Sequence, residues 1–169
     1  MARQDRRRRD RGLRALAAFR DVGAERGAAK TRWRWLALLA LVLFVALVAV
    51  APSGVPDTMI LGYSPEYPAQ FLAGLSGELG RLKASVAIDM VFPLVLTIVL
   101  VMPLAGAARL PAIGYMVADY IENIALYRFY FLGAEASANL SLVSQIKWAL
   151  VALACVVLVR ELVRTRRLP

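Results

Sequence analysis

Polar residues recur on one face of an otherwise apolar segment at 110–132, and two of them are carboxylates. At 100° per residue, a helix would place the following residues on one stripe: Tyr115, Asp119, Glu122, Asn123 and Tyr130. An ionised Asp or Lys at the centre of a membrane helix costs about 2.5 to 3.5 kcal/mol. Paired carboxylates can act as acid and base, carry ions, or hold helices together. The stripe is therefore predicted to face a bundle interior, water or a partner protein, and not lipid.

A second group combines a carboxylate with a proline in the segment 84–104. Pro93 has no N–H group, so it frees the backbone carbonyl of Asp89 and bends the helix. A carboxylate beside a free carbonyl is one way to assemble a cation site in a membrane. Ordinary helix kinks have the same residues. The sequence favours the structural kink and leaves the cation site open.

Lys147 is the cation best placed to neutralise the carboxylates from another helix, because it lies near the start of the segment 142–160. Protonation of a buried carboxylate is the alternative way to avoid the charge. Either arrangement would keep a helix bundle in one register. The candidate functional cluster is Asp89, Pro93, Tyr115, Asp119, Glu122, Asn123 and Lys147.

Four long apolar runs surround these residues. Hydrophobic residues make up 60% of the 169-residue chain, against about 45–50% in soluble domains. A helix needs about 20 largely apolar residues to cross a bilayer. Runs that fit this length lie at about 35–51, 84–104, 110–132 and 142–160. We expect an all-α, integral membrane four-helix bundle at 35–162, with no separate soluble domain.

The basic residues lie at the two ends of the chain. Twelve of the 21 Lys and Arg residues precede Trp35, and four follow Val159. Because positive residues beside a span stay in the cytoplasm, we expect four spans with cytoplasmic tails at 1–34 and 163–169. Anionic lipid headgroups are the expected partners of the N-terminal arginines.

The segment between the first two runs is predicted to lie outside and to contain an amphipathic helix. Leucines recur at three- and four-residue spacing from Leu72 to Leu82, which indicates a helical stripe. Gly74, Gly77 and Gly80 would let another helix approach closely. We expect a helix on the outer surface that begins near Pro65 and runs into the second span.

The first run resembles a signal peptide in two respects. Ala49-Val50-Ala51 has the small-x-small pattern of a cleavage site, and the apolar run is short. However, Pro52 would follow the cut, and the basic lead is longer than usual. We expect an uncleaved anchor.

Composition excludes several classes of site. The chain has one cysteine, Cys155, and no histidine, which removes disulfides, zinc-type sites and histidine-ligated haem. No cofactor is implied. The arginines adjoin a predicted span, with no zinc motif or aromatic–basic platform, so nucleic acid is not an expected partner.

The bias toward Arg and Ala is typical of a GC-rich bacterial genome, and we expect a multi-pass protein of the bacterial inner membrane.

Two short motifs carry a resemblance to a known family. Asp89, Phe92 and Pro93 form Asp-x-x-Phe-Pro, and residues 118–123 form Ala-Asp-x-x-Glu-Asn. With these motifs, residues 66–160 resemble a four-span family of small bacterial membrane proteins. The resemblance implies the fold and no established activity.

Three functions are compatible with these residues. The favoured one is a non-enzymatic accessory or assembly subunit, whose polar stripe packs helices or docks another membrane protein. A small proton or cation pathway through Asp89, Asp119 and Glu122 is the second. An intramembrane enzyme with Asp119 and Glu122 as acid and base is the third. A dry helix contact around the carboxylates would favour the first, and a water-filled cavity the second.

Overall fold

A computed structural model describes residues 31–75, 77–135 and 137–166. The chain divides into two units, Met1–Leu36 and Ala37–Pro169. The helix at Thr31–Val50 begins in the first unit, and the other helices discussed below belong to the second. The predicted contact of the arginine-rich tail with anionic headgroups falls largely on residues 1–30, outside the described residues.

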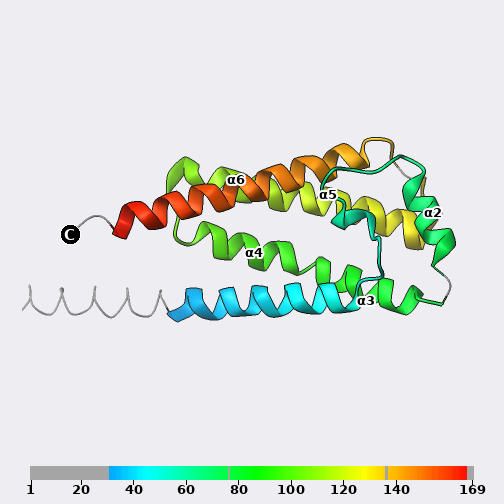
Figure 1. Ribbon diagram of the computed structural model, residues 1–169, viewed down its shortest axis with the longest axis horizontal. Helices are drawn as coiled ribbons and strands as arrows, with labels where there is room; N and C mark the ends of the chain where they lie inside the picture. The colour runs from blue at the N-terminus through cyan, green and yellow to red at the C-terminus, as the bar shows by residue number, and fades with distance from the viewer. Residues whose placement is uncertain (1–30, 76, 136, 167–169) are drawn as a thin grey trace, which may run out of the picture. The chain divides into compact units, whose positions relative to one another are not determined.

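The described part of Ala37–Pro169 consists of helices and their connections (Figure 1). An N-terminal helix is described over Thr31–Val50. The other helices are α2 (Tyr67–Gly74), α3 (Leu79–Asp89), α4 (Phe92–Val101), α5 (Leu110–Leu132) and α6 (Leu140–Arg166), with single 3₁₀ turns at η1 (Pro56–Thr58) and η2 (Gly106–Arg109). The predicted all-helical fold class is confirmed for these residues. Helix α6 also continues six residues beyond the predicted end of the last span.

Within the described residues, three helices are long and apolar enough to cross a membrane: Thr31–Val50, Leu79–Val101 and Leu140–Arg164. The third predicted span, α5, has 23 residues but is not among them. Its polar stripe lowers its mean hydropathy, although its length suffices for a bilayer. The structure thus supports three candidate spans, one fewer than the sequence predicts.

The second candidate span is broken where the sequence predicts a kink. Helix α3 ends at Asp89 and α4 begins at Phe92, with Pro93 in its first turn. A proline at this position cannot donate to the carbonyl four residues earlier, and its ring clashes with that carbonyl. Pro93 is itself fully buried. The break therefore places the end of α3 in the interior.

The predicted outer helix is interrupted before it reaches the second span. Helix α2 ends at Gly74, and α3 begins only at Leu79. Gly77 lies between them with a φ of +82°, a conformation that ends a helix and that glycine adopts without strain. The expectation of one helix running into the second span is therefore wrong.

The three glycines of this region do not mark a close helix contact. A Cβ atom built on Gly74, Gly77 or Gly80 would meet nothing within 4 Å, so the predicted close approach is also wrong. Helices do approach closely at Gly114 of α5, where an added Cβ would lie 3.3 Å from Leu150 of α6.

Two apolar clusters lie at different levels of α5 and α6. One contains Leu82, Leu126 and Leu140, and Leu72 of the predicted leucine stripe packs against it. The other contains Leu100, Ala112 and Ala154. On α5 the part of the polar stripe at 115–123 lies between the two levels, and on α6 so does Lys147, whereas Tyr130 of the stripe belongs to the first cluster. The polar residues are consequently enclosed by apolar packing along the helices that carry them.

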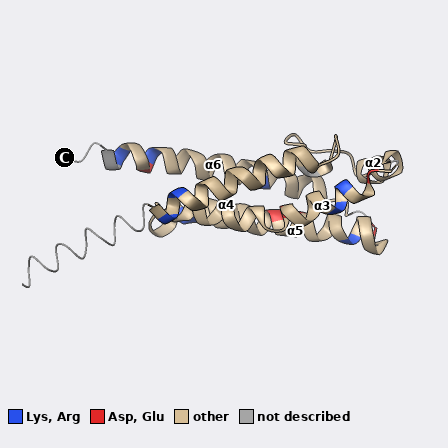
Figure 2. Ribbon diagram, turned by 90° about the horizontal axis from the view of Figure 1, so that it is seen from below, with Lys and Arg blue, Asp and Glu red and all other residues tan. Residues whose placement is uncertain are grey.

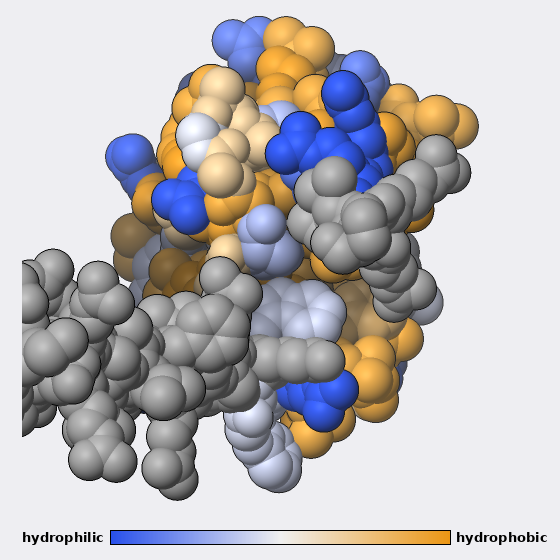
Figure 3. Space-filling view, turned by 90° about the vertical axis from the view of Figure 1, so that its left-hand side faces the viewer, coloured by the Kyte–Doolittle hydropathy of each residue, from blue (hydrophilic) through white to orange (hydrophobic). Residues whose placement is uncertain are grey.

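The outer surface of the helices is apolar. Large exposed residues of α5 recur at three- and four-residue spacing: Leu110, Ile113, Val117, Ile121 and Ile124. Figure 2 shows long uncharged stretches on the helices, with most charges toward their ends. Figure 3 looks at the end where α6 finishes and shows hydrophilic residues at several places among hydrophobic ones. An apolar surface of this extent is typical of contact with lipid.

Candidate functional site

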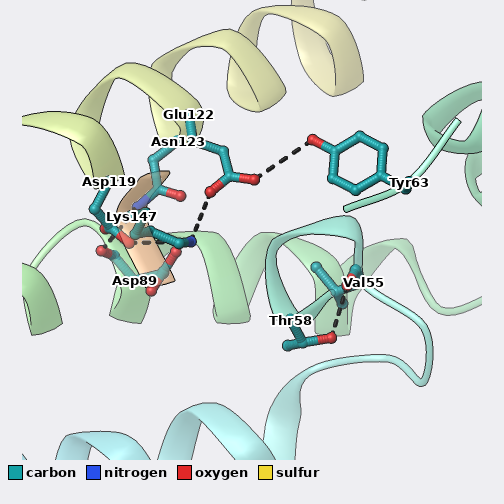
Figure 4. Close-up of polar contacts among 8 residues, drawn as sticks. All are labelled: Val55, Thr58, Tyr63, Asp89, Asp119, Glu122, Asn123 and Lys147. Atoms are coloured by element: carbon teal, nitrogen blue, oxygen red, sulfur yellow. Dashed lines mark hydrogen bonds and ion pairs between the residues drawn. The ribbon is translucent and has the colours of Figure 1, made fainter. Parts of the chain in front are cut away.

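Lys147 of α6 lies between two carboxylates of α5. Its Nζ atom is 3.1 Å from Oδ1 of Asp119 and 2.6 Å from Oε2 of Glu122. The three side chains are almost completely buried, with 3%, 4% and 0% of their surfaces exposed. Asp119 and Glu122 lie three residues apart, so one helical face presents both to the same ammonium group. Figure 4 shows the lysine reaching both carboxylates.

Asn123 connects this ion pair to the break between α3 and α4. Its Nδ2 atom donates to Oδ2 of Asp119 over 2.9 Å and to the backbone carbonyl of Asp89 over 3.2 Å. That carbonyl is the one that Pro93 cannot satisfy. A buried carbonyl without a donor costs about 1–3 kcal/mol, so Asn123 compensates for the missing N–H of the proline.

A second backbone carbonyl at the break also receives a donor from α5. The hydroxyl of Tyr120 donates to the carbonyl of Met90 over 2.9 Å. Sequence reasoning did not select Tyr120, because its role depends on the position of the break relative to α5. The two adjacent carbonyls at the end of α3 are thus both satisfied by α5 side chains.

Tyr63 is another contributor that the sequence did not reveal. Its hydroxyl donates to Oε1 of Glu122 over 3.4 Å, and its backbone N–H donates to Oγ of Ser141. Tyr63 lies between turns in the predicted outer segment, where no periodic pattern distinguishes it. The contact brings the connection before α2 onto the carboxylate cluster.

The remaining predicted residues lie in the same interior. Asp89 is 8% exposed, and its side chain points toward the ammonium end of Lys147 (Figure 4). Tyr115 is 4% exposed and occupies the turn of α5 before Asp119. Pro93 acts through the backbone, as described above. The structure therefore gathers all seven candidate residues, from α3, α4, α5 and α6.

The buried charges do not balance. Among the described residues, the buried Asp, Glu, Lys and Arg side chains are Asp89, Asp119, Glu122 and Lys147. Three carboxylates thus share one ammonium group. A buried carboxylate is stable only when it is paired, hydrogen-bonded or protonated. The cluster consequently depends on Lys147 as its cation.

A cavity of about 430 Å³ borders the cluster. Its walls are mostly apolar residues of the N-terminal helix, α4 and α6, and its lining includes Asp89, Asp119 and Lys147. The cavity is partly enclosed. The other side of the cluster, around Glu122, has no exposed surface. The site therefore joins a fully buried carboxylate, Glu122, to side chains that line an apolar cavity.

Metal binding gains no geometric support in the described part of the chain. No group of three or more Cys, Asp or Glu residues there is arranged to hold a metal ion. The carboxylates of Asp119 and Glu122 are instead directed at Lys147.

Comparison with protein families, with curated proteins and with solved structures finds no match to this chain. The resemblance carried by the two short motifs remains a resemblance, and the site has to be interpreted from its own geometry.

Proposed function

We propose that the protein is a non-enzymatic, four-span membrane protein, an accessory or assembly subunit whose buried polar cluster fixes α5 against α3 and α6. The ion pairs of Lys147 with Asp119 and Glu122 carry this proposal, because they join two helices of one chain within a buried site. In apolar surroundings, mispairing these charges would be costly, so the cluster favours a single helix register. Contacts with another membrane protein would then use the outer apolar faces.

Helix α5, the third span in chain order, completes the four spans of this proposal. Its inward face carries Asp119, Glu122 and Asn123, while its outward face presents a stripe of exposed apolar residues. Lipid would contact only the apolar face, so the low mean hydropathy of α5 does not prevent it from spanning. An even number of spans places both basic ends on the cytoplasmic side, and we propose a bacterial inner membrane as the location.

Reporter fusions at the two ends of α5 test whether it spans. We expect an alkaline phosphatase reporter, which is active only outside the cytoplasm, to be active after Gly133 and inactive after Gly106 and after Pro169. A fusion of green fluorescent protein at the same sites should give the opposite pattern. Equal activities after Gly106 and Gly133 would show that α5 does not cross the membrane and would overturn the four-span proposal.

One observation favours a second candidate function, a proton or cation pathway. The cavity reaches Asp89, Asp119 and Lys147, and a pathway would need access to such groups. The apolar lining supports the structural function instead, because a channel for hydrated ions requires polar walls or water.

Flux across proteoliposomes separates the two functions. We expect vesicles with the parent protein to show the same proton, Na⁺ and K⁺ flux as empty vesicles, under both a pH gradient and a membrane potential. The Glu122→Gln variant should leave this flux unchanged while lowering the melting temperature. Flux in the parent that disappears in Glu122→Gln, without loss of stability, would refute the structural function and establish the pathway.

A further inference from the structure

The walls of the 430 Å³ cavity combine apolar and aromatic side chains. On the N-terminal helix its lining runs from Ala37 to Val48, about 17 Å at 1.5 Å per residue. Phe44 of this helix and Phe92 of α4 both line the cavity, with ring centroids 6.0 Å apart. Pockets for small organic ligands are typically about 300–1,000 Å³ and mostly apolar. The cavity therefore has the size and lining of a site for an organic molecule.

The polar end of the cavity has more acidic than basic side chains. Asp89 and Asp119 line it together with Lys147, and among the described residues the cluster to which they belong has three buried carboxyl groups and one ammonium group. A ligand with one positive charge would reduce this imbalance. Its attraction to the carboxylates would be stronger than in water, because apolar walls exclude solvent.

Aromatic rings at the same end are suited to a cation. Tyr115 and Trp148 line the cavity beside the carboxylates, and aromatic faces attract ammonium and other organic cations. A contact between a cation and an aromatic ring already occurs within the chain, since Nζ of Lys147 lies 5.7 Å from the centre of the Trp148 ring. A neutral ligand would gain at most hydrogen bonds to the carboxylates, without the attraction between opposite charges.

We propose that this cavity binds a lipophilic organic cation, with its apolar groups against the N-terminal helix and α4 and its positive charge near Asp89 and Asp119. Partly enclosed apolar walls select hydrophobic molecules, and the carboxylates select positive ones. The proposal goes beyond the helix-fixing role of the cluster and does not depend on it, because binding needs the cavity and Asp89, whereas the helix contact needs Lys147.

Binding of tetraphenylphosphonium to the purified full-length protein in mild detergent tests the proposal. Equilibrium dialysis should show saturable binding at one site per chain. Tetraphenylborate, which has a similar size and shape and the opposite charge, should show only the partitioning seen with empty micelles. Asp89→Asn should weaken phosphonium binding by about tenfold, the effect of removing one charge contact. This change leaves the backbone carbonyl that Asn123 contacts in place.

Two further variants complete the test. Glu135→Gln removes an exposed carboxylate outside the cavity lining and should leave binding unchanged. Ala40 is buried in the cavity wall, so Ala40→Phe should fill the space and abolish binding with all carboxylates present. Equal binding of the two ions, unchanged binding in Asp89→Asn, or full binding in folded Ala40→Phe would each overturn the proposal. Should Asp89→Asn fail to fold, the two ions and Ala40→Phe still decide it.

Discussion

Lys147→Met is expected to lower the free energy of unfolding by about 3–5 kcal/mol, the typical effect of removing one partner of a buried ion pair. Methionine keeps most of the side-chain volume, so the change removes the charge without opening a large cavity. Asp119 and Glu122 would then be left in a buried site without their cation. Equilibrium unfolding in mild detergent, followed by circular dichroism, measures the loss.

Lys83→Met provides the matched control. Lys83 lies on the exposed surface of α3, with its Nζ atom 6.0 Å from the centre of the Phe131 ring. An exposed contact of this kind contributes about 0.5–1 kcal/mol, so the control should be only slightly less stable than the parent. Equal losses in the two variants would show that the carboxylates do not depend on Lys147.

Asn123→Leu is expected to destabilise the protein by about 2–4 kcal/mol, because it removes donors from two buried acceptors at once. Pro93 has no N–H group that could replace the lost donor to the carbonyl of Asp89, and Oδ2 of Asp119 loses its hydrogen bond as well. Leucine fits the site in size, so the loss should come from the unsatisfied oxygens. Thermal melting and equilibrium unfolding measure it.

Two tyrosine variants on the same helix provide reference values for the loss of stability in Asn123→Leu. Tyr120→Phe removes the single partly buried bond to the carbonyl of Met90 and should cost about 1 kcal/mol. Tyr127 is 42% exposed, and Tyr127→Phe should be neutral. If Asn123→Leu is no more harmful than Tyr127→Phe, Asn123 does not satisfy the carbonyl at the break.

The sequence predicted much of the fold because its strongest signals are local. The helical stripe of α5 follows from residue spacing alone, and the structure buries Tyr115, Asp119 and Glu122 on that one face. Pro93 predicted the helix break after Asp89, because a proline has no N–H group to donate within its own helix. Both predictions needed no knowledge of neighbouring helices.

The failures concern features that depend on tertiary contacts or on conformation. Glycine permits either close helix packing or a positive φ, and the spacing of Gly74, Gly77 and Gly80 does not distinguish them. Gly77 uses its conformational freedom to separate α2 from α3. Tyr63 and Tyr120 were missed because their acceptors become neighbours only when the chain has folded. The cavity could not be predicted, since residues of the N-terminal helix, α3, α4, α5 and α6 line it together.

A double-mutant cycle of Glu122→Gln and Lys147→Met tests the central claim most directly, because it measures the coupling between two residues that the structure places 2.6 Å apart. The free energy of unfolding is measured in the same detergent for the parent, both single variants and the double variant. If the cluster fixes the helices through this buried pair, the double variant should lose about 1–3 kcal/mol less than the sum of the two single losses. Strictly additive losses would contradict the account, since they would mean that Glu122 and Lys147 contribute independently to the fold.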